Sequence, residues 1–397
     1  MGCRVTVVDR HPYTTFQPLL YQVATGGLNP GDVTYSLRSY AGKRRPHVRF
    51  RRAHVTGIDA EARRVLCDNG DPIDYDFLVL AQGAGINHFG TPGAAEHTYS
   101  IYTRGQAIEV RDQVTTLLDQ LSVDPYREAA VVVVGGGATG VEMAGTLAEM
   151  RMQGIPIAYP EVHPSRLRVM LVEMADALLK PFDPELQHYT YEQLIQRGVD
   201  VRLNTGIAEV GENEVTFNDG ETMQADLVIW AAGIGAHPIV EQWGVPQGRG
   251  GRIEVDENLF VHGHDRIFAV GDAAIIDGQS LPQLAQPAMQ MGKHVAKQIK
   301  ALCTGEPLQP FRYDDKGIMA TIGRSAAVVE LAQGLKLKGL PAWTTWVALH
   351  LAFLLGGRNR IQAMINLGFR YLLYPRTANS IVGDVRQSDE DSAASEQ

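Results

Sequence analysis

One stretch restricts the fold of this 397-residue chain more than any other: AAVVVVGGGATGVEMAGTLAEM, residues 129–150. Its four valines predict a buried strand, and Gly135, Gly137 and Gly140 follow as a G-x-G-x-x-G turn that opens a helix. Glycines at this spacing permit a tight turn and let backbone N–H groups approach a pyrophosphate at the start of the helix. The stretch therefore predicts a dinucleotide-binding unit.

A second strand, RLRVMLVEM (166–174), ends in Glu173, which would bind the ribose hydroxyls of the dinucleotide. A carboxylate repels a 2′-phosphate, and no Arg follows in EMADALLK, so NAD is favoured over NADP. Glu173 lies 38 residues after Gly135, farther than usual, and we interpret residues 152–167 as an inserted loop. An ordinary surface acid at a strand end is the open alternative.

Composition excludes several classes of function. A formal net charge of −9 argues against a nucleic-acid partner for the whole chain. The three cysteines (Cys3, Cys67 and Cys303) have no C-x-x-C spacing and no histidine cluster, which argues against a metal site and a redox dithiol and for a reducing compartment. Alternating strand and helix patterns predict an α/β fold.

Three further sites bear candidate ligands. Gly271 and Asp272 end an apolar strand, where open α/β sheets bind ligands, although Gly-Asp pairs also form plain turns. Gln286 and Gln290 are four residues apart at a helix start, where neutral amides could bond the carbonyl oxygens of an acceptor or simply face solvent. Glu142 either complements the helix dipole or is buried beside a cofactor.

The C-terminal part changes character. Residues 316–376 contain eight Lys or Arg and one acid, and residues 339–357 contain no charged residue but are rich in Trp and Leu. Such helices suit the interface of an anionic membrane. Residues 339–357 could just span a bilayer, yet Pro341, two threonines and His350 dilute the run, so we favour interfacial binding. The acidic tail, residues 377–397, is expected to be disordered.

The order of these motifs resembles the type II NADH dehydrogenases of the pyridine nucleotide-disulphide oxidoreductase superfamily, which are single-chain, non-proton-pumping NADH:quinone oxidoreductases with FAD. The resemblance runs from about residue 4 to residue 383. Its most specific stretches are FQPLLYQVATGGL (16–28), FGTPGAAEHTYSIYT (89–103), GGGATGVEMAGTLAE (135–149), AVGDAA (269–274), AQPAMQMG (285–292) and YDDKGIMATIGRSAAV (313–328).

The resemblance implies two Rossmann-like domains, peripheral attachment to the cytoplasmic face of the plasma (inner) membrane, and a homodimer. By position it assigns Gly135, Gly137, Gly140 and Glu173 to NADH, Gln286 and Gln290 to the quinone, Glu142 and Lys316 to catalysis, and Asp9, Gln17, Pro18, Ala81, Gly83, Gly271 and Asp272 to FAD. Position 82 is Gln where many members have Thr.

These assignments give five expected regions. They are an FAD-binding domain in two parts (1–110 and 251–312), an NADH-binding domain (111–250), a membrane-associating region (313–376) and the tail (377–397). Two alternatives stay open. One is a related NAD(P)H flavoprotein reductase with another acceptor, such as a ferredoxin. The other is a non-catalytic NAD(H)-binding, membrane-associated protein that has lost FAD.

The start of the sequence departs from the family. RVTVV, ending at Asp9, matches the second strand of the FAD half, and in the family a strand–GxGxxG–helix unit precedes it. We therefore expect Met1 to be an internal methionine of a longer reading frame. The missing unit would supply the helix N-terminus that binds the FAD pyrophosphate.

This expectation predicts different visible spectra for two proteins. A form extended upstream in frame should be yellow and bleach with NADH, whereas the 397-residue chain should bind FAD weakly if it lacks the glycine turn that binds the FAD pyrophosphate in the family. Absorption spectra before and after NADH measure this. Equal yellow colour in both proteins would show that the upstream unit is dispensable.

Overall fold

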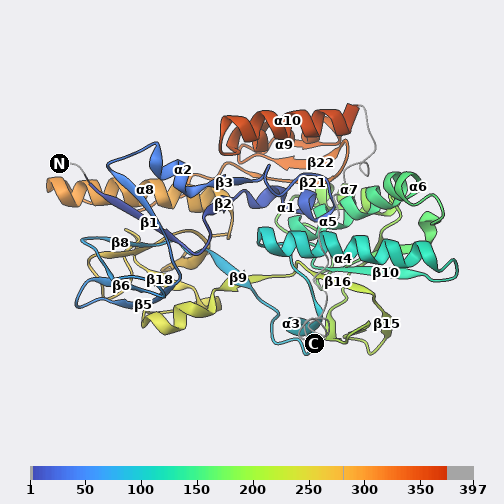
Figure 1. Ribbon diagram of the computed structural model, residues 1–397, viewed down its shortest axis with the longest axis horizontal. Helices are drawn as coiled ribbons and strands as arrows, with labels where there is room; N and C mark the ends of the chain where they lie inside the picture. The colour runs from blue at the N-terminus through green and yellow to red at the C-terminus, as the bar shows by residue number, and fades with distance from the viewer. Residues whose placement is uncertain (1–2, 280, 373–397) are drawn as a thin grey trace, which may run out of the picture. The chain divides into compact units, whose positions relative to one another are not determined.

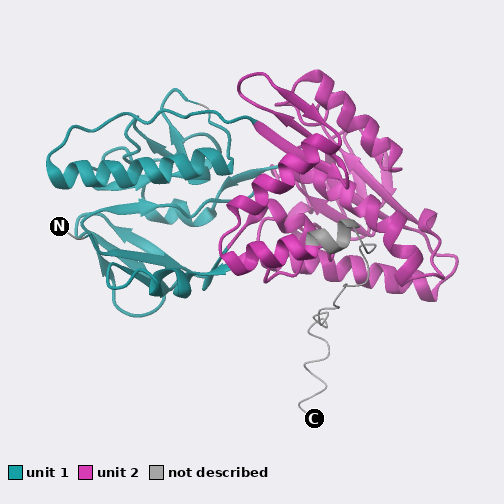
Figure 2. Cartoon of the chain, turned by 90° about the horizontal axis from the view of Figure 1, so that it is seen from above, with its two compact units in different colours: residues 1–14, 35–87, 233–317 teal, residues 15–34, 88–232, 318–397 magenta. Residues whose placement is uncertain are grey.

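The computed structural model describes residues 3–279 and 281–372, so the predicted tail, 377–397, lies outside the described residues. Contacts divide the chain into two compact units (Figure 2). Unit 1 comprises residues 1–14, 35–87 and 233–317, and unit 2 comprises residues 15–34, 88–232 and 318–397. Each unit mixes helices with sheets, which agrees with the predicted α/β class.

Unit 1 is built from short strands and two helices of regular α-form. Its elements are β1 (Val5–Asp9), α2 (Leu37–Gly42), β4 (Val48–Arg52), β5 (Val55–Asp59), β6 (Arg64–Cys67), β7 (Ile73–Asp74), β8 (Leu78–Leu80), β9 (Ala84–Ile86), β17 (Ile234–Ala236), β18 (Ile253–Val255), β19 (Ile267–Ala269), β20 (Ala274–Ile276) and α8 (Ala285–Thr304). Two further strands, β2 (Tyr13–Thr15) and β3 (Thr34–Ser36), pair where the chain passes between the units.

Parallel pairing in unit 1 brings distant segments together. β1 pairs with β4, and β8 pairs with β19 so that Leu80 lies opposite Ala269. The carboxyl ends of β8 and β19 therefore lie side by side, which places residues 81–83 beside Gly271. The core of this unit includes Phe268, Val255 and Val295 of α8, each nearly inaccessible to solvent.

Unit 2 contains most of the helices in the described residues. Its elements are α1 (Leu20–Ala24), α3 (Ala94–His97), α4 (Arg104–Val123), β10 (Ala129–Val134), α5 (Ala138–Glu149), α6 (Ile155–Ala158), β11 (Leu167–Val172), α7 (Pro184–Gln196), β12 (Asp200–Arg202), β13 (Ile207–Val210), β14 (Glu214–Phe217), β15 (Thr222–Gln224), β16 (Leu227–Trp230), β21 (Ile318–Gly323), β22 (Ala326–Glu330), β23 (Lys336–Lys338), α9 (Leu340–Phe353) and α10 (Gly357–Leu372) (Figure 1).

A parallel sheet in the order β12-β11-β10-β16 forms the centre of unit 2. β10 is buried on both faces, as expected for an inner parallel strand, and this burial explains its uninterrupted run of valines. α4 begins with a capping box in which Thr103 and Gln106 exchange side-chain and backbone hydrogen bonds. The helix α5 follows β10 directly through the predicted glycine turn.

The region 152–167, predicted as an inserted loop, is partly helical. α5 runs without a break into a π-helical turn, Met150–Gly154, and then into α6. Pro156 lies in α6 directly after the π-helical turn, so the proline did not end the helix as the sequence suggested.

The compact units differ in their limits from the predicted domains, 1–110, 111–250 and 251–312. Residues 88–110 belong to unit 2 and residues 233–250 to unit 1. The chain leaves unit 1 after β9 and returns at β17, and these two strands pair with each other in antiparallel register. Where the chain leaves and re-enters unit 1, the Asn87 N–H donates a hydrogen bond to the Gly233 carbonyl, next to this strand pair.

Within unit 2, α5 packs very closely on β21. A Cβ added at Gly145 would lie 1.9 Å from the carbonyl oxygen of Ile322. Such a distance leaves no room for any side chain, so the helix and the strand can approach only because residue 145 is glycine.

Gly145→Ala should therefore lower the free energy of unfolding by about 2 kcal/mol or more, although Ala is the better helix former. Gly292→Ala is the matched control, because exposed Gly292 of α8 has nothing within 4 Å of an added Cβ. It should raise stability by about 0.5–1 kcal/mol. Denaturant unfolding measures both, and a neutral Gly145→Ala would contradict the close packing.

Candidate functional site

The glycine turn after β10 has the geometry of a phosphate-binding loop. Gly135 has a φ of +110°, and a Cβ at Gly140 would lie 1.8 Å from the Gly135 carbonyl oxygen, so α5 packs against the turn itself. Gly137 differs, because an added Cβ there would meet nothing within 4 Å. Gly137 is also the N-cap of α5, and no side chain caps that end. The turn thus offers open space and helix N–H groups to an anion.

Glu173 lies where β11 ends, beside this turn. Its carboxylate accepts hydrogen bonds from the Gly136 N–H at 2.5 Å and from the Ala175 N–H at 2.6 Å. The sequence predicted Glu173 as a ribose ligand, and the structure adds a contact with the glycine turn that the sequence did not indicate. Because a carboxylate has about four acceptor positions, these two bonds leave capacity for ribose hydroxyls.

Glu142, on α5, is buried, as the second of its two predicted interpretations requires. Its Oε1 accepts a hydrogen bond of 3.2 Å from the Thr321 N–H of β21. The Thr321 hydroxyl in turn lies 3.1 Å from the Tyr21 hydroxyl of α1. Burial raises the pKa of Glu142 from 4.5 to about 8, while the hydrogen bonds from Thr321 act in the opposite direction. A carboxyl group in this environment is protonated at neutral pH.

Several residues assigned to FAD gather at the carboxyl ends of β8 and β19 in unit 1. Ala81 and Gly83 follow β8, and Gly271 and Asp272 follow β19. Gly271 has a φ of +69°, and a Cβ there would lie 3.1 Å from the Cβ of Ala288 in α8. This edge is the position at which open parallel sheets bind ligands.

The other residues assigned to FAD are dispersed. Asp9 ends β1, where its carboxylate accepts a 2.7 Å hydrogen bond from the His11 N–H, and burial raises the pKa of Asp9. Gln17 and Pro18 belong to unit 2, and the Gln17 amide donates to the Tyr102 carbonyl at 3.1 Å.

Gln82 tests whether unit 1 fits a bound flavin. Both polar atoms of its amide are buried, and neither forms a hydrogen bond within the described residues. An unpaired buried amide is costly, and native proteins rarely keep one. A group that offers both a donor and an acceptor beside residues 81–83 would satisfy it, and the ring edge of a flavin is such a group. The residues therefore fit FAD.

The two glutamines of α8 differ in their contacts. Gln290 donates from Nε2 to the Asp314 carbonyl and accepts at Oε1 from the Asp314 N–H, both at 2.9 Å. The side chain of the half-buried Gln286 makes no hydrogen bond within the described residues. Lys316 is exposed, and its ammonium group pairs with the Asp314 carboxylate.

The matching family is that of the pyridine nucleotide-disulphide oxidoreductases, over residues 1–292. The type II NADH:quinone oxidoreductase Ndh of Mycobacterium tuberculosis is 33% identical over 387 residues, which cover 93% of this chain and 83% of that protein. The type II NADH:quinone oxidoreductase of Haemophilus influenzae is 32% identical over 359 residues, covering 83% and 80%. The chain belongs to the type II NADH:quinone oxidoreductases.

A solved structure agrees with this membership of the type II NADH:quinone oxidoreductases at the level of the fold. The structure of NDH2 from Plasmodium falciparum in complex with NADH superposes with a TM-score of 0.87 at 21% identity, covering 94% of each chain. This superposition confirms the predicted fold class, and the sequence relatives confirm the predicted family.

In this type II NADH:quinone oxidoreductase, α9 and α10 expose apolar side chains. The exposed residues are Leu340, Leu349 and Phe353 of α9 and Ile361, Met364 and Ile365 of α10, and Leu355 between the two helices is exposed as well. Two asparagines of α10 bind residues 32–34 of the same unit. Asn359 donates to the Thr34 carbonyl at 2.6 Å, and Asn366 donates to the Asp32 carboxylate at 2.9 Å. The part of the chain that the structure describes contains no helix with the length and hydropathy of a membrane span.

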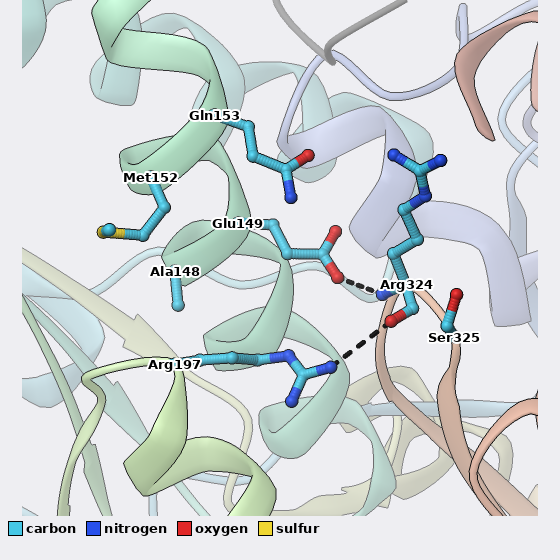
Figure 3. A pocket seen from close by; sticks show the side chains of 7 residues that line it. All are labelled: Ala148, Glu149, Met152, Gln153, Arg197, Arg324 and Ser325. Atoms are coloured by element: carbon cyan, nitrogen blue, oxygen red, sulfur yellow. Dashed lines mark hydrogen bonds between the residues drawn. The ribbon is translucent and has the colours of Figure 1, made fainter. Parts of the chain in front are cut away.

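A second contact joins α5 to the β21–β22 hairpin, at the C-terminal end of the helix. The sequence analysis did not predict it. The buried Glu149 accepts a hydrogen bond from the Arg324 N–H, and Arg197 donates to the Arg324 carbonyl at 3.3 Å (Figure 3). Figure 3 shows these groups around a hollow that Met152, Gln153 and Ser325 also line. Glu142 and Glu149, seven residues apart on one helix face, both bind backbone N–H groups of the β21–β22 hairpin.

Burial of Glu142 predicts how stability depends on pH. The folded protein keeps the Glu142 proton up to about pH 8, whereas the unfolded chain releases it near 4.5. Stability should therefore fall as pH rises from 4.5 to 8, by on the order of 4 kcal/mol from this group. Glu142→Gln removes this contribution, so the variant should gain stability relative to the native protein across that range.

Denaturant unfolding from pH 5 to pH 9 measures this difference. Glu128→Gln is the control, because Glu128 is an exposed acid of the same unit. A constant difference between native protein and Glu142→Gln across this range would show that Glu142 is ionised in the folded state.

Proposed function

We propose that this chain is an FAD-dependent NADH:quinone oxidoreductase that does not pump protons. The observation that carries the proposal is the open glycine turn at the start of α5, in a chain about one third identical to type II NADH:quinone oxidoreductases over most of its length. When bound, FAD accepts a hydride from NADH and passes two electrons to the quinone.

The residues of unit 2 bind and orient NADH. The N–H groups at the start of α5 bind the pyrophosphate in the space that Gly137 leaves open, and the favourable end of the helix dipole supports this contact. Glu173 fixes the turn through the Gly136 N–H and accepts from the ribose hydroxyls. Its carboxylate disfavours a 2′-phosphate, so NADH is the preferred donor over NADPH.

Side chains are the proposed source of the proton that the reaction takes up. A quinol contains two added protons, of which the hydride from NADH accounts for one, and Glu142 is a buried carboxyl group that holds a proton at neutral pH. The Thr321 N–H fixes the orientation of that carboxyl group. The Lys316 ammonium group is the second proposed proton-bearing group, and Gln286 and Gln290 are the proposed glutamines of the quinone site.

A quinone acceptor, which is found in the membrane, would explain why α9 and α10 expose apolar residues. A quinone is lipid-soluble, and apolar side chains beside Arg358 and Arg360 suit the headgroup region of an anionic bilayer. A reductase for a soluble ferredoxin has no need of such a surface. Peripheral binding at the cytoplasmic face and a homodimer, both implied by the resemblance, belong to the same proposal.

The proposed NADH site predicts the effect of Gly137→Val. The protein has room for this side chain and the φ of −72° suits valine, so the fold should keep its stability. The side chain would fill the pyrophosphate space, so the Kd for NADH should rise at least about 10-fold. Titration with NADH and thermal unfolding measure the two effects.

Activity with a soluble quinone analogue should fall in parallel with NADH binding in Gly137→Val. Gly105→Ala, in α4, is a control in the same unit and should leave both unchanged, since its added Cβ meets nothing closer than 3.9 Å. NADH oxidation that proceeds with a ferredoxin but not with a quinone would favour the alternative reductase.

A further inference from the structure

A hollow of about 270 Å³ opens at the C-terminal end of α5, the opposite end of the helix from the glycine turn. Three segments of unit 2 that are distant in the sequence form its wall (Figure 3). They are the end of α5 with the π-helical turn that follows, the residue after α7, and the turn between β21 and β22. None of the residues proposed above to bind NADH, FAD or quinone lines this hollow.

Two unusual backbone features border the hollow. Ser325, in the β21–β22 turn, has a φ of +61°, a left-handed conformation that costs serine more than glycine. On the other side, the chain of α5 passes through the π-helical turn Met150–Gly154. Residues held in a left-handed conformation and π-helical turns both concentrate at functional sites. The hollow is therefore a place to look for a ligand.

Main-chain contacts fix the β21–β22 turn from two sides. The Arg324 N–H donates to the buried Glu149 carboxylate, and the Arg324 carbonyl accepts from Arg197 at 3.3 Å. Figure 3 shows the Arg324 guanidinium and the Ser325 hydroxyl extending from the turn in the same direction, with the Gln153 amide facing them from the π-helical turn. Side chains of two segments thus present hydrogen-bond donors to the same space.

The wall of the hollow has a net positive formal charge, in a chain whose formal net charge is −9. Arg197 and Arg324 are its basic residues, and Glu149 is its acidic residue. The Arg197 guanidinium has five N–H groups, of which two donate to Gln193 and one to the Arg324 carbonyl. Two N–H groups of Arg197 therefore remain for a ligand. Guanidinium groups at this density suit the oxygens of an anion.

A phosphate group fits this wall better than a carboxylate. A carboxylate has two oxygens in one plane, which a single guanidinium can satisfy, whereas a phosphate monoester has three terminal oxygens and about 1.5 to 2 negative charges at pH 7. Donors from three segments match oxygens that point in three directions. The volume lies just below the range of about 300–1,000 Å³ that is usual for small-molecule sites, so it has room for a phosphate group with a small organic part.

We propose that this hollow binds a phosphate group, either inorganic phosphate or the phosphate of a small ester, through Arg324, Ser325 and Gln153 with Arg197 as the second cation. The bound phosphate joins the β21–β22 turn to the π-helical turn and so stabilises the packing of the hairpin on α5. The inference does not depend on the proposed function, since it concerns none of the residues assigned to NADH, FAD or quinone.

Phosphate binding is best measured in the full chain carrying Gly137→Val, which closes the other proposed anion site of unit 2. Calorimetric titration with inorganic phosphate, at an ionic strength held constant with NaCl, gives the Kd. Adding Arg324→Ala should raise this Kd at least about 10-fold, because it removes a charge-assisted contact. The main-chain contacts of residue 324 do not require its side chain, so the variant should keep its fold.

Arg168→Ala in the same background is the matched control. Arg168 is an exposed arginine of β11 in unit 2 that does not line the hollow, so the Kd should stay unchanged. Absence of phosphate binding in Gly137→Val, or an equal Kd after Arg324→Ala, would overturn the proposal.

Ser325→Gly separates backbone strain from binding. Glycine adopts a positive φ at no steric cost, so the variant should unfold at a higher temperature than its parent. It also lacks the hydroxyl group, so the Kd for phosphate should rise at least about 2-fold. A higher unfolding temperature with an unchanged Kd would remove Ser325 from the site and contradict the proposed set of donors.

Two more probes define the class of ligand. Tighter binding of glycerol 3-phosphate than of inorganic phosphate would identify an ester as the ligand, and the opposite order would identify free phosphate. Succinate, a dianion with planar carboxylates, should bind at least about 10-fold more weakly than the better of the two. Equal or tighter binding of succinate would overturn the assignment of a phosphate group.

Discussion

The contact of α5 with its surroundings is the constraint on which unit 2 depends. At its start the helix packs on the Gly135 carbonyl through Gly140, and in its middle it packs on the Ile322 carbonyl through Gly145. Two buried carboxyl groups, Glu142 and Glu149, hold the same hairpin through backbone N–H groups. The helix whose N-terminus is the proposed dinucleotide site is therefore held by the sheet at one end and by the C-terminal hairpin along its length. A rigid helix would fix the position of the proposed anion site, because the N–H groups of that site belong to its first turn.

Burial of Glu142 connects this packing to chemistry. The close approach of β21 removes water from the carboxyl group, and loss of water disfavours its charged form. The Thr321 N–H offsets part of that effect and orients the group. The glycine at position 145 thus has a consequence beyond packing, since a wider gap between α5 and β21 would admit water to Glu142 and return its pKa toward the ordinary value.

Sequence patterns predicted local features well and distant partners poorly. The valine strand, the glycine turn and Glu173 at the next strand end are all set by residues close in the sequence, and the structure places them as expected. The partner of Glu142 is Thr321, 179 residues away, and the partner of Gln290 is Asp314, 24 residues away. No periodicity reveals such pairs, because they depend on which segments pack together. The π-helical turn at Met150–Gly154 was missed for a different reason, because the prolines of residues 152–167 were interpreted as marks of a loop.

Pairing between β8 and β19 has a consequence for how the protein is made on the ribosome. Arg266, just before β19, and Asp76, just before β8, are 190 residues apart yet joined by a hydrogen bond. At ordinary elongation rates of about 5–20 residues per second, β8 waits roughly 10–40 seconds before its parallel neighbour emerges. Unit 1 cannot close during that interval, whereas the sheet of unit 2 from β10 to β16 is complete by residue 230. All strands of the central sheet of unit 2 are therefore synthesised before β8 can meet β19, which emerges only as the last third of the polypeptide begins.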